Sequence, residues 1–224
     1  MSEPLLNLNH IFPSFDGEVN YYGQGTPSVF VRLQGCNLKC VWCDTAYAQD
    51  PSKKKMVSVD HVLSIIRCHG IKKVTITGGE PLLQKRGLSL LIQRLLLLKY
   101  KITVETNGSI PWTDIVVLSD RIKWVVDYKL PDSGCQEKML PLDNFLLDLG
   151  EFDFIKFVID SYSDFYHAVS VQETLQGMGA FCRYAYSPTS NFSSKILYQN
   201  MMEYPGILDK ALLNIQLHKL LQIL

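Results

Sequence analysis

The chain has 224 residues, 47 % of them hydrophobic, so it can bury one substantial core, and we expect a single domain over residues 1–224. Lysine and arginine together number 22, as do aspartate and glutamate, so no net charge is present to concentrate nucleic acid or an anionic membrane. Residues 1–13 lack the pattern of a secretory signal and the apolar stretch 211–224 is too short to span a membrane, so we expect a cytoplasmic protein whose partner is a small molecule, not nucleic acid or a membrane.

The first predicted strand, residues 28–34, leads directly into a loop that contains three cysteines. Cys36, Cys40 and Cys43 have the spacing C-x3-C-x2-C. Three thiolates can ligate three irons of a [4Fe-4S] cluster, and the remaining iron keeps an open position where a small molecule can bind and react. The loop therefore predicts a catalytic iron–sulfur cluster at the end of this strand.

Two other uses of the cysteines fit the pattern less well. A structural zinc site takes four ligands, usually from two knuckles, whereas Cys68, Cys135 and Cys182 are scattered singly and supply no second knuckle. A disulfide framework is typical of short secreted chains, while exposed thiolates persist in a reducing cytoplasm. Isolated cysteines most often pack as small buried hydrophobes, so we assign these three no role.

Helices and strands alternate after the cysteine loop. A helix begins at Val59, with Ser58 as its N-cap, and ends at Gly70. The later elements are strands 73–77, 101–106, 122–128, 154–159 and 181–186, a helix over 87–99 and a helix that begins near Asp164. Residues 131–149 mix Pro, Asp and Gly with Leu, which predicts either a helical insertion or a mobile lid.

This alternation predicts a mostly parallel sheet with right-handed crossovers. Six strands are too few for a closed eight-stranded barrel, so we expect an α/β fold with an open, partial (β/α)6 TIM-like barrel. Polar residues at the carboxyl ends of such strands face one crevice. These strand ends are the cysteine loop and residues 77–80, 106–108, 127–129 and 187–189.

The cysteine loop and the run Gly78-Gly79-Glu80-Pro81 together resemble the radical S-adenosylmethionine enzymes. The resemblance implies a partial barrel of the radical SAM type, whose open iron chelates the amino and carboxylate groups of S-adenosylmethionine. It also implies that the reduced cluster cleaves this cofactor to a radical that takes a hydrogen atom from the substrate. Because glycine has no side chain, Gly78 and Gly79 would let the backbone approach the ligand's ammonium group.

Four further segments resemble the 7-carboxy-7-deazaguanine synthase family, namely residues 11–18, 29–35, 42–45 and 216–219. This resemblance implies a lyase that converts 6-carboxy-5,6,7,8-tetrahydropterin into 7-carboxy-7-deazaguanine with loss of ammonia, in the biosynthesis of queuosine-type deazapurines. It further implies Mg2+ as a cofactor beside the cluster and S-adenosylmethionine, a homodimer, and an electron donor such as flavodoxin.

The same resemblance implies roles for individual residues. Cys36, Cys40 and Cys43 would ligate the cluster, and Thr45 would bind Mg2+ through its hydroxyl oxygen. For Arg32 the chemistry of the side chain is a second reason to expect a substrate contact, because its planar fork can pair with a pterin carboxylate through two parallel hydrogen bonds. Contacts to S-adenosylmethionine are implied for Trp42, Cys43, Asp44, Gly79, Lys129 and Ser187, and contacts to the substrate for Phe15, Asp16, Gly17, Arg32 and Thr77.

Two segments depart from the family pattern. Asp16-Gly17-Glu18 stands where the family usually has Gln-Gly-Glu, so an ionised carboxylate that only accepts replaces an amide that also donates. Asp127-Tyr128-Lys129 stands where the family often has Ser-Pro-Lys. The protein could therefore act on a related substrate. Two other functions also stay open: another small radical enzyme, such as an activase acting on a glycine of a partner protein, and a non-catalytic iron–sulfur or zinc module. Glu105 is assigned no role.

Overall fold

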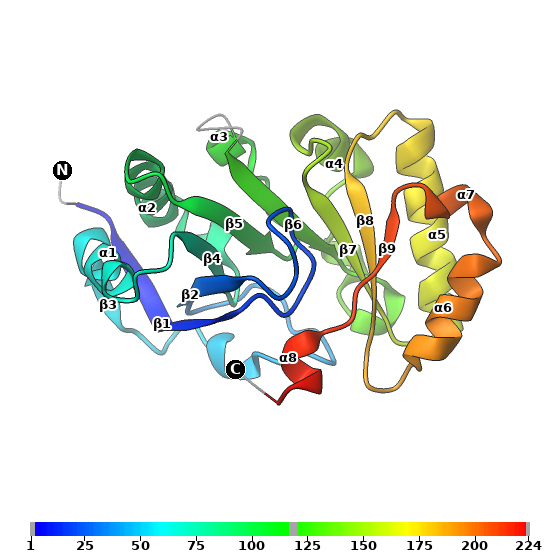
Figure 1. Ribbon diagram of the computed structural model, residues 1–224, viewed down its shortest axis with the longest axis horizontal. Helices are drawn as coiled ribbons and strands as arrows, with labels where there is room; N and C mark the ends of the chain where they lie inside the picture. Colours follow the sequence, from blue (N-terminus) through cyan, green and yellow to red (C-terminus); the bar gives the residue numbers. More distant parts are fainter. Residues whose placement is uncertain (1–2, 117–120, 223–224) are drawn as a thin grey trace.

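A nine-stranded sheet organises the protein, whose computed structural model describes residues 3–116 and 121–222 (Figure 1). The strands lie in the order β3-β1-β2-β4-β5-β6-β7-β8-β9. Neighbours from β2 to β9 are parallel, whereas β1 is antiparallel to both β2 and β3. The strand bounds are β1 Leu5–Phe15, β2 Pro27–Leu33, β3 Met56–Ser58, β4 Lys73–Gly78, β5 Lys101–Thr106, β6 Ile122–Tyr128, β7 Phe154–Ile159, β8 Arg183–Pro188 and β9 Ala211–Leu213.

Helices flank this sheet, with α1 and α2 at one end and α5 and α6 at the other (Figure 1). The helix bounds are α1 Val59–Cys68, α2 Lys85–Leu97, α3 Thr113–Val116, α4 Leu142–Asp148, α5 Tyr162–Gly177, α6 Ser194–Met202, α7 Pro205–Leu208 and α8 Leu217–Leu220. Short 3-10 helices are η1 Ala46–Ala48, η2 Pro81–Gln84, η3 Pro131–Ser133 and η4 Gln136–Lys138. In the described part of the chain, no helix has the length and apolar character that crossing a membrane requires.

The predicted fold class is confirmed, because the six predicted strands are β2 and β4 to β8 and the sheet is open. Five of them agree with the predicted bounds to within one residue. The last begins two residues later than predicted, since Phe181 is 71 % exposed and precedes the strand. Strands β1, β3 and β9 were not predicted. They extend the parallel sheet at its two edges.

The predicted helices are also present. Ser58 caps α1 as expected, because its hydroxyl accepts a hydrogen bond from the His61 N–H at 3.2 Å. Residues 131–149 are largely helical, with η3, η4 and α4 in succession, which agrees with the helical insertion. This insertion supports the cysteine loop, since the Val41 N–H donates to the Ser133 carbonyl at 3.1 Å.

The loop formed by residues 16–26 packs against the face of the sheet opposite the main core. Its Val19 contacts a small apolar cluster made of Val125, Phe154 and Ala185, on β6, β7 and β8. Next to it, the Ser28 and Thr75 hydroxyls bond at 2.8 Å with both residues fully buried. The loop therefore fills the space near the amino ends of the parallel strands, and open space is left toward their carboxyl ends.

Candidate active site

A cavity of about 600 Å³ lies at the carboxyl ends of the parallel strands. Most of the predicted site residues line it, although they come from segments far apart in the chain. They are Phe15, Gly17, Arg32, Cys36, Cys40, Trp42, Cys43, Asp44, Thr45, Thr77, Gly79 and Lys129. The fold thus gathers the three cysteines and most of the residues expected beside them around one space.

Asp16 does not line this cavity, contrary to the expectation that it contacts a substrate. It is 2 % exposed, and its carboxylate pairs with Lys73 and accepts hydrogen bonds from Thr75 at 2.9 Å and Asn20 at 3.0 Å. A carboxylate is tolerated in place of the family's amide because Lys73, at the start of β4, compensates its charge. The side chain of Asp16 therefore anchors the loop to the sheet.

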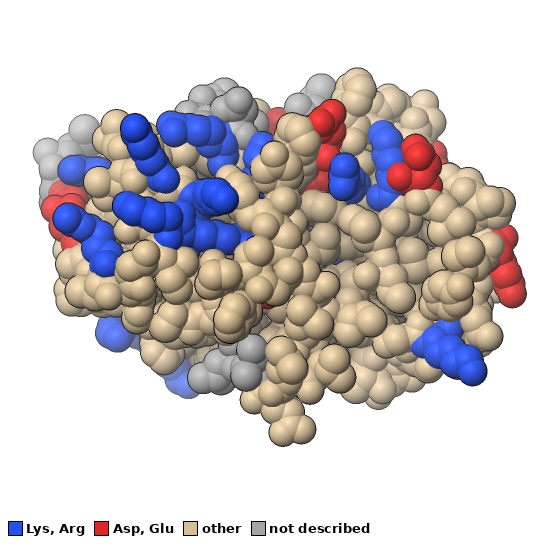
Figure 2. Space-filling view, viewed as in Figure 1, with Lys and Arg blue, Asp and Glu red and all other residues tan. Residues whose placement is uncertain are grey.

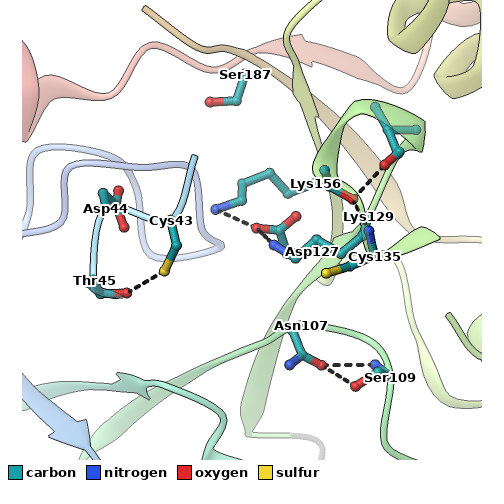
Figure 3. A network of polar contacts seen from close by, with 12 residues as sticks. Cys43, Asp44, Thr45, Asn107, Ser109, Asp127, Lys129, Cys135, Lys156 and Ser187 are labelled. Atoms are coloured by element: carbon teal, nitrogen blue, oxygen red, sulfur yellow. Dashed lines mark hydrogen bonds and ion pairs between the residues drawn. The ribbon is translucent and has the colours of Figure 1, made fainter. Parts of the chain in front are cut away.

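Ser187 is also absent from the cavity wall, contrary to the expectation that it contacts a cofactor. It is fully buried and its hydroxyl accepts a hydrogen bond from Asn214 at 3.3 Å. Figure 3 shows Ser187 apart from the charged side chains of the cavity floor. Side chains alternate between the two faces of a strand, and β8 ends at Pro188. The residues that reach the cavity are therefore those directly after β8. Thr189 and Ser190 line it.

The three cysteine thiols are half-buried in the cavity wall. Burial raises the pKa of Cys36, and it raises that of Cys40 to about 12, so ionisation of these thiols must be driven by a bound cation. Among the described residues, no three Cys, His, Asp or Glu side chains are arranged to hold a single metal ion. A cubic cluster needs no such common point, because each thiolate ligates a different iron. The loop fits a cluster in this respect.

Gly78 and Gly79 are required by the packing of the cysteine loop. Gly78 has a φ of 141°, and a Cβ there would overlap the Leu33 backbone. A Cβ on Gly79 would overlap the Gly35 carbonyl. The loop is then held by backbone hydrogen bonds, including one from the Glu80 N–H to the Gly35 carbonyl at 2.8 Å. Close approach to a ligand's ammonium group stays a prediction, but packing alone already demands glycine here.

The guanidinium of Arg32 is held in a fixed position in the cavity wall, where it can bind an anion. Its guanidinium carbon lies 5.6 Å from the centre of the Phe12 ring and 5.7 Å from that of Tyr47, so two aromatic faces hold the fork in place. Within the described part of the chain, its Nε is buried without a hydrogen-bond partner. A buried donor of this kind costs free energy until a partner arrives. The fork therefore favours a carboxylate in the cavity.

Four charged side chains form a chain of ion pairs across the cavity floor. Figure 3 shows three of them, Asp127, Lys129 and Lys156. Lys156 lies 2.6 Å from Glu18 and 3.3 Å from Asp127, and Lys129 lies 2.9 Å from Asp127. Burial opposes the ionisation of Glu18, yet Lys156 outweighs it and lowers the pKa of Glu18 to about 2. Burial likewise opposes the charge on Lys156, but Glu18 and Asp127 raise its pKa well above the usual value. Glu18 and Lys156 are therefore both charged at neutral pH.

Glu105 projects from β5 into the same cavity. Burial, and then the charge of Glu18, raise its pKa from 4.5 to about 7, although Lys156 opposes this. Near neutral pH this carboxyl can therefore give or take a proton. No role was assigned to it from the sequence, because a glutamate in a strand is as readily explained by solvation or a structural pair.

Glu105→Gln is expected to change the pH dependence of stability. Between pH 4.5 and about 7 the folded state keeps the Glu105 proton while the unfolded state releases it, so wild-type stability falls as pH rises through this range. The free energy of unfolding of the variant does not fall in this way. The difference between the variant and the wild type should therefore increase by on the order of 2 kcal/mol from pH 4.5 to about 7. Urea unfolding at several pH values measures this. Glu151→Gln, at an exposed position, is the control, and a constant difference from pH 4.5 to 8 would contradict the assignment.

The segment that contains α8 closes one side of the cavity and was given no role from the sequence. The Gln216 side chain donates to Glu18 at 2.6 Å, and Lys219 pairs with Asp44 at 3.5 Å. A Cβ on Gly17 would overlap the His218 ring, which explains the glycine. Lys156 was missed too, although a lysine inside the apolar strand Phe154–Ile159 was a usable signal for an inward-facing charge.

Comparisons with known proteins agree with this geometry. Residues 30–127 match the Radical SAM superfamily. The 7-carboxy-7-deazaguanine synthase of Clostridium acetobutylicum is 38 % identical over 161 residues, which cover 71 % of this chain and 71 % of that protein. That of Koribacter versatilis is 37 % identical over 163 residues, covering 71 % and 67 %. The crystal structure of QueE from Escherichia coli has the same fold, with a TM-score of 0.68 and 21 % identity over 95 % of this chain and 94 % of that one. The chain therefore belongs to the 7-carboxy-7-deazaguanine synthase family of the Radical SAM superfamily.

Proposed function

We propose that this protein is a radical SAM lyase that contracts the ring of 6-carboxy-5,6,7,8-tetrahydropterin to give 7-carboxy-7-deazaguanine and ammonia. The observation that carries the proposal is that the three-cysteine loop and Arg32, whose Nε has no hydrogen-bond partner among the described residues, line the same cavity. A cavity of about 600 Å³ suits a small substrate and a cofactor together. An activase would instead need a broad surface to dock its protein substrate.

The residues of this chain would divide the work as follows. Cys36, Cys40 and Cys43 would hold the cluster, which together with S-adenosylmethionine would supply the radical chemistry of the reaction. Arg32 would pair with the pterin carboxylate and fix the position of the ring that reacts. The floor and the α8 segment would exclude water. Glu105, which lines the cavity and has a pKa of about 7, would donate a proton to the departing nitrogen.

We also propose that Thr45 binds Mg2+. Its hydroxyl lies in the cavity wall, 3.7 Å from the Cys43 sulfur (Figure 3). One protein oxygen is enough for this ion, because Mg2+ keeps several waters and takes further oxygen ligands from its substrate. The ion would hold substrate oxygens during the rearrangement.

Thr45→Val is expected to raise the Mg2+ concentration needed for half-maximal activity by about tenfold or more, because the hydroxyl ligand is lost while the shape is kept. Activity is measured against Mg2+ concentration with the cluster absorbance checked in each sample. Thr189→Val removes another hydroxyl from the cavity wall and should leave the Mg2+ requirement as it is. An unchanged requirement in Thr45→Val would remove the assigned role.

Partners follow from the same proposal. An electron donor such as flavodoxin would approach the cluster at the outer side of its loop, where Val41 is 78 % exposed next to Cys40. We propose a homodimer in the cytoplasm, with residues 1–224 of each chain acting as one domain. Cross-linking and light scattering test the dimer directly.

The decisive experiment is anaerobic reconstitution of the cluster, followed by mass analysis of products from the carboxytetrahydropterin. The proposal expects a product that has lost ammonia, together with 5'-deoxyadenosine. Cys43→Ala is the control and should give neither. Formation of 5'-deoxyadenosine without conversion of the pterin would instead indicate a related substrate.

A further inference from the structure

Asn107 links the carboxyl end of β5 to the cysteine loop. The link starts at Glu80, which is fully buried and accepts hydrogen bonds from the Leu82 N–H at 2.9 Å, the Thr106 hydroxyl at 2.8 Å and the Asn107 N–H at 2.7 Å. Three donors around one carboxylate fix the backbone at residues 106 and 107. Asn107 itself is only 7 % exposed, so its side chain has little freedom.

The hydrogen bonds of Asn107 determine which end of its amide faces the cysteines. Its side-chain oxygen accepts from the Ser109 N–H at 3.0 Å and from the Ser109 hydroxyl at 2.6 Å (Figure 3). A backbone N–H can only donate, so the oxygen must face Ser109 and the NH2 group must face the other way. That group donates to the Asn37 side chain at 3.0 Å and to the Cys36 sulfur at 3.8 Å.

Cys36 therefore has two N–H donors directed at its sulfur, because the Leu38 N–H also lies 3.4 Å away. Hydrogen bonds to the ligating sulfurs help set the reduction potential of an iron–sulfur cluster. Reduction adds one negative charge to the cluster, and N–H donors stabilise that charge. A donor that is held rigidly from a buried strand end should act more strongly than one on an exposed side chain.

We propose that Asn107 is a positioning residue for the cluster, which orients Cys36 and raises the reduction potential of the bound cluster through its N–H···S hydrogen bond. The inference rests on the cluster and not on the proposed pterin substrate. It assigns to the segment after β5 a role in determining which electron donors can reduce the enzyme, separate from any contact with a substrate.

The test is a redox titration of the reconstituted holoenzyme without pterin, with mediators as the electron source and the cluster absorbance as the signal. At the ambient potential where the wild type is half reduced, the ratio of reduced to oxidised cluster is expected to fall about three- to tenfold in Asn107→Ala. The ratio of reduced to oxidised cluster should fall further in Asn107→Asp, because this variant places a carboxylate beside the sulfur. Both keep the backbone N–H that bonds Glu80.

Thr106→Val is the matched control. It removes a donor to the same Glu80 carboxylate from the neighbouring residue, so it should lower the melting temperature while leaving the ratio of reduced to oxidised cluster at the wild-type value. Two outcomes would overturn the proposal: wild-type ratios of reduced to oxidised cluster in both Asn107 variants, or an equal fall of that ratio in Thr106→Val. An equal fall would mean that Asn107 acts only by supporting Glu80 and the fold.

Discussion

Replacing Lys156 by methionine is expected to lower the free energy of unfolding by about 3–5 kcal/mol. Lys156 and Glu18 are 12 % and 15 % exposed, and Lys156 is the cation that lies between Glu18 and Asp127. Methionine keeps the length of the side chain but leaves two carboxylates facing each other in a site that water reaches poorly. For a chain of this size the melting temperature should fall by about 10 °C, measurable by calorimetry or circular dichroism.

The dependence of this effect on pH provides a second check. The pKa of Glu18 is about 2 in the folded protein and 4.5 ordinarily, so its pairing with Lys156 stabilises the wild type fully above pH 4.5 and is lost as pH falls toward 2. The difference between wild type and Lys156→Met should therefore shrink through that range. Adding Glu18→Gln to Lys156→Met should recover part of the stability, because one unpaired charge is removed.

Lys138→Met is the control for the loss of a lysine as such. Lys138 lies 4.0 Å from Glu137 at a site where both are more than 60 % exposed. An exposed pair of this kind contributes less than about 1 kcal/mol. If Lys156→Met were no more destabilising than Lys138→Met, the buried pairing of Lys156 with Glu18 and Asp127 would not contribute to the stability of the fold.

Arg32→Lys is expected to lower kcat/KM for the carboxytetrahydropterin by about 10- to 100-fold. Lysine keeps the positive charge but lacks the planar fork, so it cannot make two parallel hydrogen bonds to a carboxylate or stack in the same way between Phe12 and Tyr47. Most of the loss should appear in KM, because the interaction already exists in the bound substrate. Steady-state kinetics under anaerobic conditions measure both parameters.

Two comparisons make the Arg32 result specific. Arg94→Lys, on the exposed side of α2, should leave kcat/KM at the wild-type value. The stability of Arg32→Lys should change little, because the folded protein loses only two cation–π contacts of about 0.5–1 kcal/mol each. Wild-type kinetics in Arg32→Lys would show that the substrate carboxylate is bound elsewhere.

The parallel part of the fold could be predicted because its strands are buried on both faces. Such strands read as short β-branched runs between turn residues, and β5, β6 and β7 were predicted to the residue. Strand β1 was not, since His10, Pro13 and two asparagines interrupt its apolar positions and a register shift follows Leu8. Strands β3 and β9 have three residues each, too few for any periodicity. They exist because longer neighbours offer an open edge.

The site could be predicted where chemistry and position along the chain coincide. The cysteines and Thr77 follow or end strands, and the carboxyl ends of parallel strands necessarily meet. The burial of the Asp16 side chain could not be predicted in this way, because it depends on an ion pair with Lys73, a residue on another strand that faces the same interior. The contribution of Gln216 and His218 was equally hidden, since no local pattern states where a short segment after β9 will pack.

The hydrogen bond between Gln216 and Glu18 joins residues 198 positions apart, which makes the cavity a late product of synthesis. A ribosome that has released the chain only as far as β8 has already delivered all three cysteines and the strands that hold them, but not the wall formed by α8. A bulky group placed next to α8 would obstruct the docking of that wall, because Gln216 and Lys219 must reach Glu18 and Asp44.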